Sequence, residues 1–384
     1  MPEPLRVRRL GEADADSIAE FIRAAAWDPD ATPESARNML RTAAADNPFE
    51  PGEGPPTVGV FMGARLVGYV SSIPTRFWNG SGYAAAHWIK GWWVLEEYRN
   101  TPIGFLLLKE MLKQVGLVAS MPASLLPRRL SEALGMRDLG AVRDYVAPLR
   151  PARLLRKLDF ERLEHLKALP APLSLAVRLA RIPPFAQAVG AVIVLSLATL
   201  RLPSASAGRR LSALLGARLP DEAALDSLWM RAQRALSSSA TRSGAYLRWR
   251  YESAASGHYA FATVWRADEL VALAVLAPPR RSSDPRIAGL AIGSVVDLVL
   301  DPDCAGALPR VLGVARRWAR SAGYDALLLT ASRRALRAPL LRAGYLPAPG
   351  NIHLLLRDPG GSHGLSTDLD AWMVTRGDAW GDHL

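Results

Sequence analysis

The sequence contains the same order of expected elements twice, once before residue 150 and once after residue 221. In each half, two β-like runs joined by a short turn precede a third strand, a helix, a strand, a second helix and a final strand. The second helix ends at a glycine in both halves, at Gly135 and at Gly344. Such a repeat predicts two units of one architecture. Strands that alternate with helices predict an α/β fold with a mixed central sheet in each unit.

The length of the chain agrees with this division. A chain of 384 residues exceeds the usual size of a single core, so two domains are expected. We predict an N-terminal domain over residues 1–150, a basic and partly apolar helical linker over 151–220, and a C-terminal domain over 221–384. Hydrophobic residues make up 49% and charged residues 22% of the chain, which is typical of a globular protein.

The linker carries most of the positive charge. The chain has a net charge of +11, and residues 148–218 hold twelve Lys or Arg residues against three acidic ones. The same segment contains a mostly apolar run over Phe185–Leu200, which is shorter than the roughly 20 residues that cross a bilayer. One interpretation is a peripheral contact of residues 151–218 with an anionic membrane. The other is a core helix packed between the domains, with solvated arginines around it.

Other residue types exclude several classes of protein. The single cysteine, Cys304, rules out a disulfide framework, and we expect it to be a small buried hydrophobe in a cytoplasmic protein. The six histidines show no metal-ligand spacing, so no metal is expected. The N-terminal residues contain no apolar stretch of the kind that a secretory signal needs. The expected location is therefore the cytoplasm, with the inner membrane face as the alternative that the linker raises.

The most informative stretch runs from Trp92 to Leu112. A strand ends at Leu95, a tight basic turn follows, and a helix begins near Pro102. Backbone N–H groups in such a turn point outward together, and the helix dipole adds partial positive charge. The turn therefore suits a pyrophosphate, and Arg99 places a cation beside it. The alternative is an ordinary strand-to-helix turn with a surface arginine.

At this turn the sequence resembles the GNAT acyltransferase superfamily. The hexapeptide Arg99–Gly104 is similar to the phosphate-binding signature of that family, and Trp93–Tyr98 is similar to its fourth strand. Leu134–Met136, followed by Gly140, resembles its Leu-Gly-Phe element. The resemblance covers about residues 5–150 and implies two GNAT-like domains with acetyl-CoA or another acyl-CoA as donor. The donor contacts that it implies are Val94, Leu95, Arg99, Asn100, Thr101, Ile103 and Gly104.

Two positions depart from the family pattern. Pro102 stands where the family has its first glycine, which removes one amide donor, although proline suits the first position of a helix. Ser131 stands where the family often has the tyrosine that protonates the leaving thiolate. Serine is a poor acid, so water or another residue is expected to protonate the thiol.

The second half resembles the family less closely. Val296–Pro302 is similar to the fourth strand, but the turn after it, Asp303–Ala307, contains no cation. Asp301 and Asp303 would repel a pyrophosphate, so we expect this half to bind no CoA. Two further stretches resemble elements of two-domain GNAT proteins near bacterial surface-polysaccharide or lipid pathways: Tyr246–Tyr251 and Trp372–Asp378.

Acyl transfer to an amine requires a general base. Glu96 and Glu97 lie at the strand end nearest the expected thioester, and His87 lies near the start of the same strand. Because successive strand residues face opposite sides, at most one of the two glutamates points toward the donor. The alternative for each glutamate is a solvated surface charge, and for His87 it is a core histidine whose hydrogen bonds are made within the protein. Four tryptophans of this half are expected in the core or in the walls of a cleft: Trp78, Trp88, Trp92 and Trp93.

Three functions from different classes follow. The leading one is an acyltransferase that moves an acyl group from acyl-CoA, or from an acidic acyl carrier protein docked on the basic linker, to an amine or hydroxyl of a small molecule, glycan or lipid. The second is a non-catalytic GNAT-like scaffold or sensor. The third is an aminoacyl transferase similar to the Fem family, which would use tRNA. The basic segment has few aromatic residues to stack on bases, so no nucleic acid partner is expected.

Overall fold

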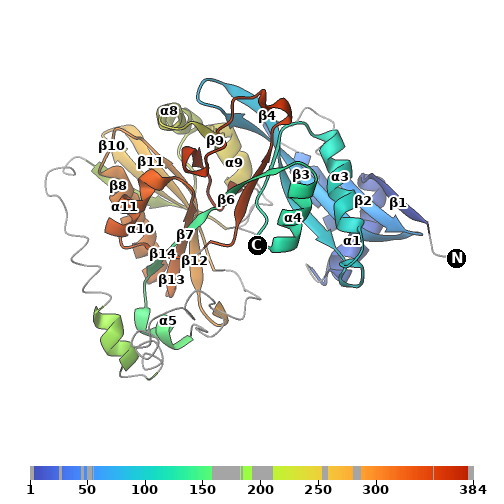
Figure 1. The fold of residues 1–384 in the computed structure, drawn as a ribbon. Helices are drawn as coiled ribbons and strands as arrows, with labels where there is room; N and C mark the ends of the chain where they lie inside the picture. Colours follow the sequence, from blue (N-terminus) through green and yellow to red (C-terminus); the bar gives the residue numbers. More distant parts are fainter. Residues whose placement is uncertain are drawn as a thin grey trace.

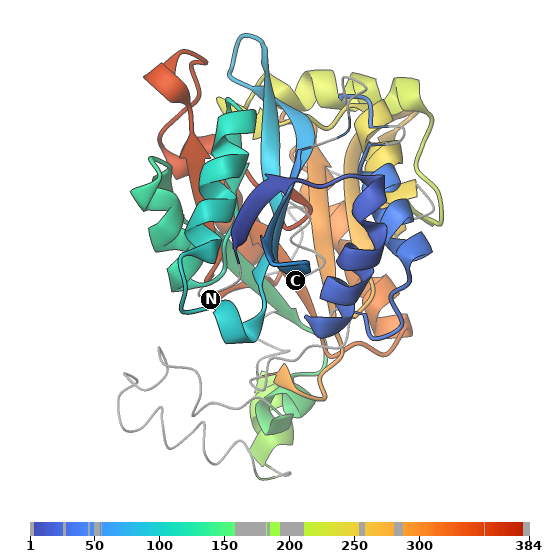
Figure 2. The ribbon, with the colours of Figure 1, turned by 90° about the vertical axis from the view of Figure 1, so that its right-hand side faces the viewer.

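The protein consists of two mixed β-sheets that lie side by side, each with helices on both faces (Figures 1 and 2). This confirms the α/β fold with two similar halves that the sequence predicts. The computed structural model describes residues 4–25, 28–44, 47–49, 54, 56–157, 182, 185–192, 211–252, 258–279, 287–348 and 350–378.

The first half supplies most of the first sheet. Its strands are β1 (Leu5–Arg9), β2 (Thr57–Met62), β3 (Arg65–Trp78), β4 (Tyr83–Val94), β5 (Val118–Ser120) and β6 (Arg137–Ala141). The helices that cover it are α1 (Ala15–Ala24), α2 (Pro33–Ala44), α3 (Ile103–Gln114) and α4 (Leu125–Ala133). In Figure 2 the strands stand between α1 and α2 on one side and α3 and α4 on the other. With β15 (His353–Arg357) of the second half, the strand order is β1–β2–β3–β4–β5–β15–β6.

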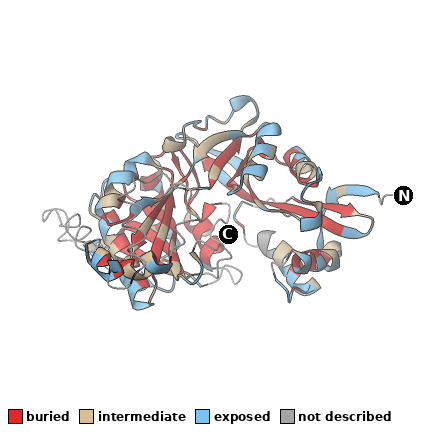
Figure 3. Cartoon of the chain, turned by 60° about the horizontal axis from the view of Figure 1, so that its bottom comes forward, coloured by how far each residue is buried: buried red, intermediate tan, exposed pale blue. Residues whose placement is uncertain are grey.

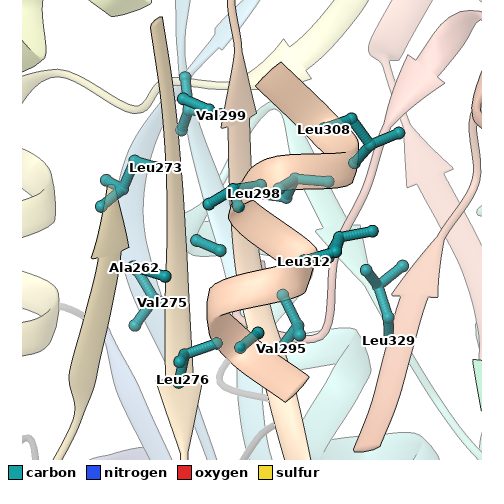
Figure 4. Packing of buried hydrophobic residues seen from close by; sticks show 14 of the residues in the cluster. Ala262, Leu273, Val275, Leu276, Val295, Leu298, Val299, Leu308, Leu312 and Leu329 are labelled. Carbon is teal, nitrogen blue, oxygen red and sulfur yellow. The ribbon is translucent and has the colours of Figure 1, made fainter. Parts of the chain in front are cut away.

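The second half repeats this arrangement. Its strands are β8 (Leu211–Gly216), β10 (Ala260–Arg266), β11 (Glu269–Ala277), β12 (Ile292–Leu300), β13 (Ala326–Ala331) and β14 (Leu346–Ala348). Its helices are α8 (Glu222–Gln233), α9 (Gly244–Glu252), α10 (Ala307–Ser321) and α11 (Arg337–Arg342). With β7 (Arg143–Pro148) of the first half, the strand order is β14–β7–β13–β12–β11–β10–β8. Helix α10 packs its buried leucines, Leu308 and Leu312, against β11, β12 and β13 (Figure 4).

The two halves exchange their last strands. β7 (Arg143–Pro148) comes from the first half but lies in the second sheet, between β13 and β14. β15 (His353–Arg357) comes from the second half but lies in the first sheet, between β5 and β6. The sequence predicts each strand in the sheet of its own half, and this prediction is wrong. Both strands are short and mainly apolar, so their patterns fit either sheet.

A shared core joins the halves at the exchange. Phe77 on β3 packs edge-on against Trp88 on β4 at 5.2 Å and against Trp372 at 5.5 Å between ring centroids. Trp372 begins the short strand β16 (Trp372–Met373), which pairs with β9 (Ser238–Ala240), and β9 in turn pairs with β3. Phe77, Trp88 and Trp372 belong to a third cluster of buried residues, which both halves supply and which is separate from the core of each half (Figure 3).

The linker differs from the expected helical segment. Residues 211–216 form β8, which pairs with β10 at the edge of the second sheet, because Leu211 and Ala213 alternate toward the core. Helix α5 (Pro151–Lys157) and a helix over residues 185–192 are described, and the remainder of the linker before residue 211, apart from residue 182, lies outside the described residues. Within the described part of the chain, every helix is too short or too polar to span a bilayer.

Candidate functional site

Strands β4 and β5 separate at the centre of the first sheet. These parallel strands pair only at His87 with Val118 and at Trp88 with Ala119. Beyond Trp88, β4 continues along β3 and no longer pairs with β5. We call the opening between residues 89–94 of β4 and the end of β5 the first fork.

A β-bulge bends β4 inside the first fork. Tyr69 pairs with Trp93 and Ser71 with Lys90, so β4 holds one more residue than β3 between these pairs. Gly91 has a φ of +62° at this point, which is a left-handed conformation that favours glycine. The bulge leaves backbone polar groups of β4 outside the regular ladder, as is common beside functional sites.

The turn after β4 leads into α3 through a 3-10 helix, η2 (Glu96–Tyr98). The N–H groups of Arg99 and Thr101 donate to Glu96 and Tyr98 carbonyls at 3.2 and 3.1 Å, so they are occupied within the turn. The N–H groups of Gly104 and Phe105 lie in the first turn of α3, where amides have no intrahelical acceptor. Anion-binding amides are therefore expected at residues 104 and 105, which are the last of the predicted donor contacts and the residue after it.

Two predicted features of this turn differ in detail. Pro102 is the N-cap of α3, whereas the sequence predicts it at the first helical position, so the helix begins one residue later than expected. Arg99 is exposed, and its guanidinium lies over the indole ring of Trp93 at 5.3 Å from the centroid. An arginine held on an aromatic face keeps its N–H groups available to a phosphate.

The structure brings only some of the predicted donor contacts together. Gly104 faces Val94, Trp92 and Leu130 of α4, each in ordinary van der Waals range of a side chain at that position. Asn100 and Thr101 are exposed in the turn, and Ile103 is buried. Leu95 is buried in the core, and its N–H donates to Val67 at 3.0 Å. Leu130 was not predicted, because an apolar residue on an amphipathic helix gives no functional signal.

The three candidate bases lie at opposite ends of the fork. Glu96 and Glu97 are exposed on η2, and Glu97 pairs with Arg65 at 3.0 Å, on the hairpin side of the sheet. His87 lies where β4 and β5 begin to separate, seven residues and roughly 20 Å along the strand from Val94. Its Nδ1 is 3.1 Å from the Ser72 hydroxyl, and burial lowers the pKa of His87 to about 4.

A polar cluster formed by the exchange was not predicted. His353 on β15 lies 2.9 Å from Asp138 on β6, and Arg128 on α4 lies 2.9 Å from its Nε2. These contacts join β15, the exchanged strand, to β6 and α4 of the first half. Asp138 and His353 are 215 residues apart, so no sequence spacing could have revealed the pair. Ser131 on the same helix is fully buried and donates to the Pro127 carbonyl at 2.9 Å.

The corresponding opening of the second half is filled by the chain itself. β12 and β13 pair from Ile292 with Ala326 to Val295 with Leu329, and β12 then bulges at Val296. The Val296 carbonyl accepts from the Gly377 N–H at 2.6 Å. On the opposite side, Thr375 bridges to Ala331, and Ser332 donates to Val374. We call the opening between β12 after Val295 and the end of β13 the second fork, and these two strands its arms. We call residues 372–378 the plug, because they form hydrogen bonds with both arms.

A buried ionic network holds the plug. Arg242 donates to Asp297 on β12 and to Asp378 of the plug, both at 2.8 Å, and all three side chains are at most 4% exposed. Thr375 and Tyr251 also donate to Asp297, at 3.1 Å each. Burial alone would lower the pKa of Arg242, but the two carboxylates outweigh it and raise that pKa. Burial raises the pKa of Asp378 against the opposing charge of Arg242.

The turn of the second half differs from the simple acidic turn that the sequence indicates. Asp301 is buried, its Oδ2 lies 2.9 Å from Arg231, and its Oδ1 accepts from the Asp303 N–H. Its charge is therefore compensated, which weakens the predicted repulsion of a pyrophosphate. The N–H of Cys304, a partly buried free cysteine, donates to the Asp301 carbonyl, so amides of this turn are already occupied.

The second half contains a small cavity. A cavity of about 30 Å³ lies among α8, β12 and the plug, with room for one or two water molecules. It is lined by Trp229, Leu236, Arg242, Leu298, Arg333 and Met373. Among the residues that the structure describes, His, Cys, Asp and Glu side chains form no group of three placed to hold a metal.

Comparisons with known proteins show the fold. No protein family and no curated protein matches the sequence. N-myristoyltransferase from Saccharomyces cerevisiae with bound myristoyl-CoA has a similar structure, with a TM-score of 0.58 and 15% identity over 97% of this chain and 85% of that one. A GCN5-related N-acetyltransferase from Anabaena variabilis has a TM-score of 0.56 and 10% identity, over 92% and 72%. A probable N-acyltransferase from Enterococcus faecalis has a TM-score of 0.54 and 11% identity, over 92% and 73%. The chain therefore has a GNAT-like fold over most of its length.

Proposed function

We propose that the protein transfers an acyl group from acyl-CoA to an amine or hydroxyl acceptor, with the first fork as its donor site. The single observation that supports this most is the first fork itself. It combines a bulged strand, first-turn amides at Gly104 and Phe105, and the exposed Arg99. The solved structures with this fold include one that holds myristoyl-CoA.

The proposed reaction is a direct transfer. The acceptor nitrogen or oxygen attacks the thioester carbonyl, the carbon–sulfur bond breaks, and CoA leaves as a thiolate. The acceptor loses one proton to a base, and the thiolate takes one proton from water or from a side chain. His87 is the best-placed base of the three candidates because it lies where β4 and β5 separate. Its lowered pKa keeps the ring unprotonated at neutral pH, so it can accept a proton, but also makes it a weaker base than a free imidazole.

Calorimetry with CoA tests the donor site. Arg99→Ala should weaken CoA binding by roughly 1.5–3 kcal/mol, the scale of a charge-assisted hydrogen bond. Arg317→Ala, at an exposed position on α10 in the other half, is the matched control and should bind CoA like the unaltered protein. Unchanged CoA affinity in Arg99→Ala would remove Arg99 from the site.

An assay of thiol release from acetyl-CoA with a panel of amines tests catalysis. His87→Gln should lose most of the amine-dependent release while its CoA affinity stays the same. Equal release by the variant and the unaltered protein would reject His87 as the base.

A non-catalytic role is the second candidate, and one observation favours it. Ser131 occupies the position of the family's acid, and its hydroxyl is buried and bonded to a backbone carbonyl. A protein that binds CoA at the first fork but releases no thiol with any amine or alcohol would support this role.

A further inference from the structure

A pair of helices projects from one end of the second sheet. Helix α5 and the helix over residues 185–192 lie together there in both views (Figures 1 and 2). Gly190 packs directly on Ala152 of α5, and Ala186, one turn earlier, is fully buried. We call these two helices the basal helix pair. The pair is anchored by Arg153, which lies 3.3 Å from the buried carboxylate of Asp325.

The outer face of the 185–192 helix is apolar and open to solvent. Phe185 is 49% exposed and Val192 is 63% exposed, and Ala188 between them is also exposed. Their spacing of three and four residues puts all three on one face of the helix. Ile182, just before the helix, is 45% exposed. Gly190 and Ala186 face α5, so the stripe is not the side by which this helix is attached to the protein.

Positive charge lies on the other helix of the pair. Arg150, Arg156 and Lys157 are exposed at the ends of α5. Residues 150–157 and 185–192 contain no Asp or Glu. A projecting apolar stripe on a helix pair that also exposes cations is typical of helices that lie at a membrane surface, with apolar side chains at the headgroup boundary.

We propose that the basal helix pair docks on an anionic lipid surface. The apolar stripe would enter the headgroup boundary, and Arg150, Arg156 and Lys157 would lie among anionic headgroups. Charge complementarity favours lipid over a neutral apolar partner. A nucleic acid is disfavoured because Phe185 is the only aromatic side chain of the two described helices, whereas single strands bind on several stacking rings. This proposal does not depend on the donor site.

Exposed side chains also weigh against the core-helix interpretation of the apolar run. A helix packed between the two halves would bury Phe185 and Val192, and both are about half exposed or more. The described part of the run lies beside α5 instead. Residues 193–200 lie outside the described residues.

Flotation of the full chain with vesicles tests the proposal. The protein should float with phosphatidylglycerol-containing vesicles at low salt, remain behind with pure phosphatidylcholine, and detach as salt rises. The double variant Phe185→Asp, Val192→Asp should bind at least tenfold less. Removing one charge by Arg156→Gln should weaken binding about fivefold. Because these side chains are exposed, the variants should melt at the same temperature as the unaltered protein.

Met230→Asp is the matched control, because Met230 is 54% exposed but lies on α8 of the second half. It should float like the unaltered protein. Three results would overturn the proposal: no flotation with anionic vesicles at low salt, equal loss of binding in the control, or a dimer in sedimentation that the double variant converts to monomer. The last result would identify a second copy of the chain as the occupant of the stripe.

Discussion

The two forks share a geometry and differ in what fills them. In each half, two parallel central strands pair briefly and then separate at a bulge, Gly91 in the first and Val296 in the second. The first fork ends at a turn with an exposed arginine and first-turn amides. The second is bonded on both arms by the plug. The comparison suggests that one copy of a duplicated fold keeps its central strands apart beside an exposed turn, while the other has become a structural joint.

The largest effect is expected from breaking the ionic network of the plug. Arg242→Ala leaves Asp297 and Asp378 buried without their partner, which should lower the free energy of unfolding by about 3–5 kcal/mol. Urea unfolding of the variant and of the unaltered protein measures this difference in the free energy of unfolding. Arg266→Ala, which removes a half-exposed pair with Glu269, is the control and should cost no more than about 1 kcal/mol. A loss of that small size in Arg242→Ala would mean that the network does not hold the plug.

A smaller effect should follow from crowding the plug at Gly377. A side-chain carbon at this position would meet the Tyr251 hydroxyl and lie 2.9 Å from the Val296 carbonyl. Gly377→Ala should therefore destabilise the protein by roughly 1–3 kcal/mol. Gly313→Ala in α10 has room for the added carbon and should be neutral or stabilising by up to about 1 kcal/mol. Similar unfolding curves for both variants would contradict a tightly fitted plug.

The smallest of the stability effects concerns His87 and pH. Its folded pKa, about 4, lies below the unfolded value near 6.5, so the unfolded chain binds more protons between these values. Stability contributed by the neutral ring is present above pH 6.5 and is lost as pH falls toward 4. In His87→Gln the acid-induced loss across this window should shrink by on the order of 1–2 kcal/mol. An unchanged pH dependence of the unfolding free energy would show that the ring is not buried in solution.

The repeated architecture and the turn at Arg99–Gly104 could be predicted because their signals are local. Each hydrophobic run, each glycine that ends a helix and the strand-to-helix turn is defined by a few consecutive residues. The bulge at Gly91 also had a local signal, a glycine inside an aromatic strand. Which amides are available to a ligand could not be predicted, because those of Arg99 and Thr101 donate to carbonyls within the turn.

The strand exchange and the plug depend on contacts that no local pattern encodes. Arg242 bonds to Asp297 and Asp378, which lie 55 and 136 residues away in the sequence. β7 and β15 are short apolar strands that would fit either sheet. Asp301 looked like a repulsive surface charge, and only the structure places Arg231 beside it. The sequence therefore predicted the kind of fold and the strand-to-helix turn at Arg99–Gly104, whereas the difference between the two forks had to be observed.

A crystal structure with CoA tests the central claim that only the first fork takes the donor. We expect one CoA per chain, with its pyrophosphate at the first turn of α3 beside Arg99 and its pantetheine arm between Trp92 and Leu130. The plug should remain bonded to Val296 and Ala331. CoA density at the turn around Cys304, with the plug displaced, would contradict the claim, as would CoA bound only outside the first fork.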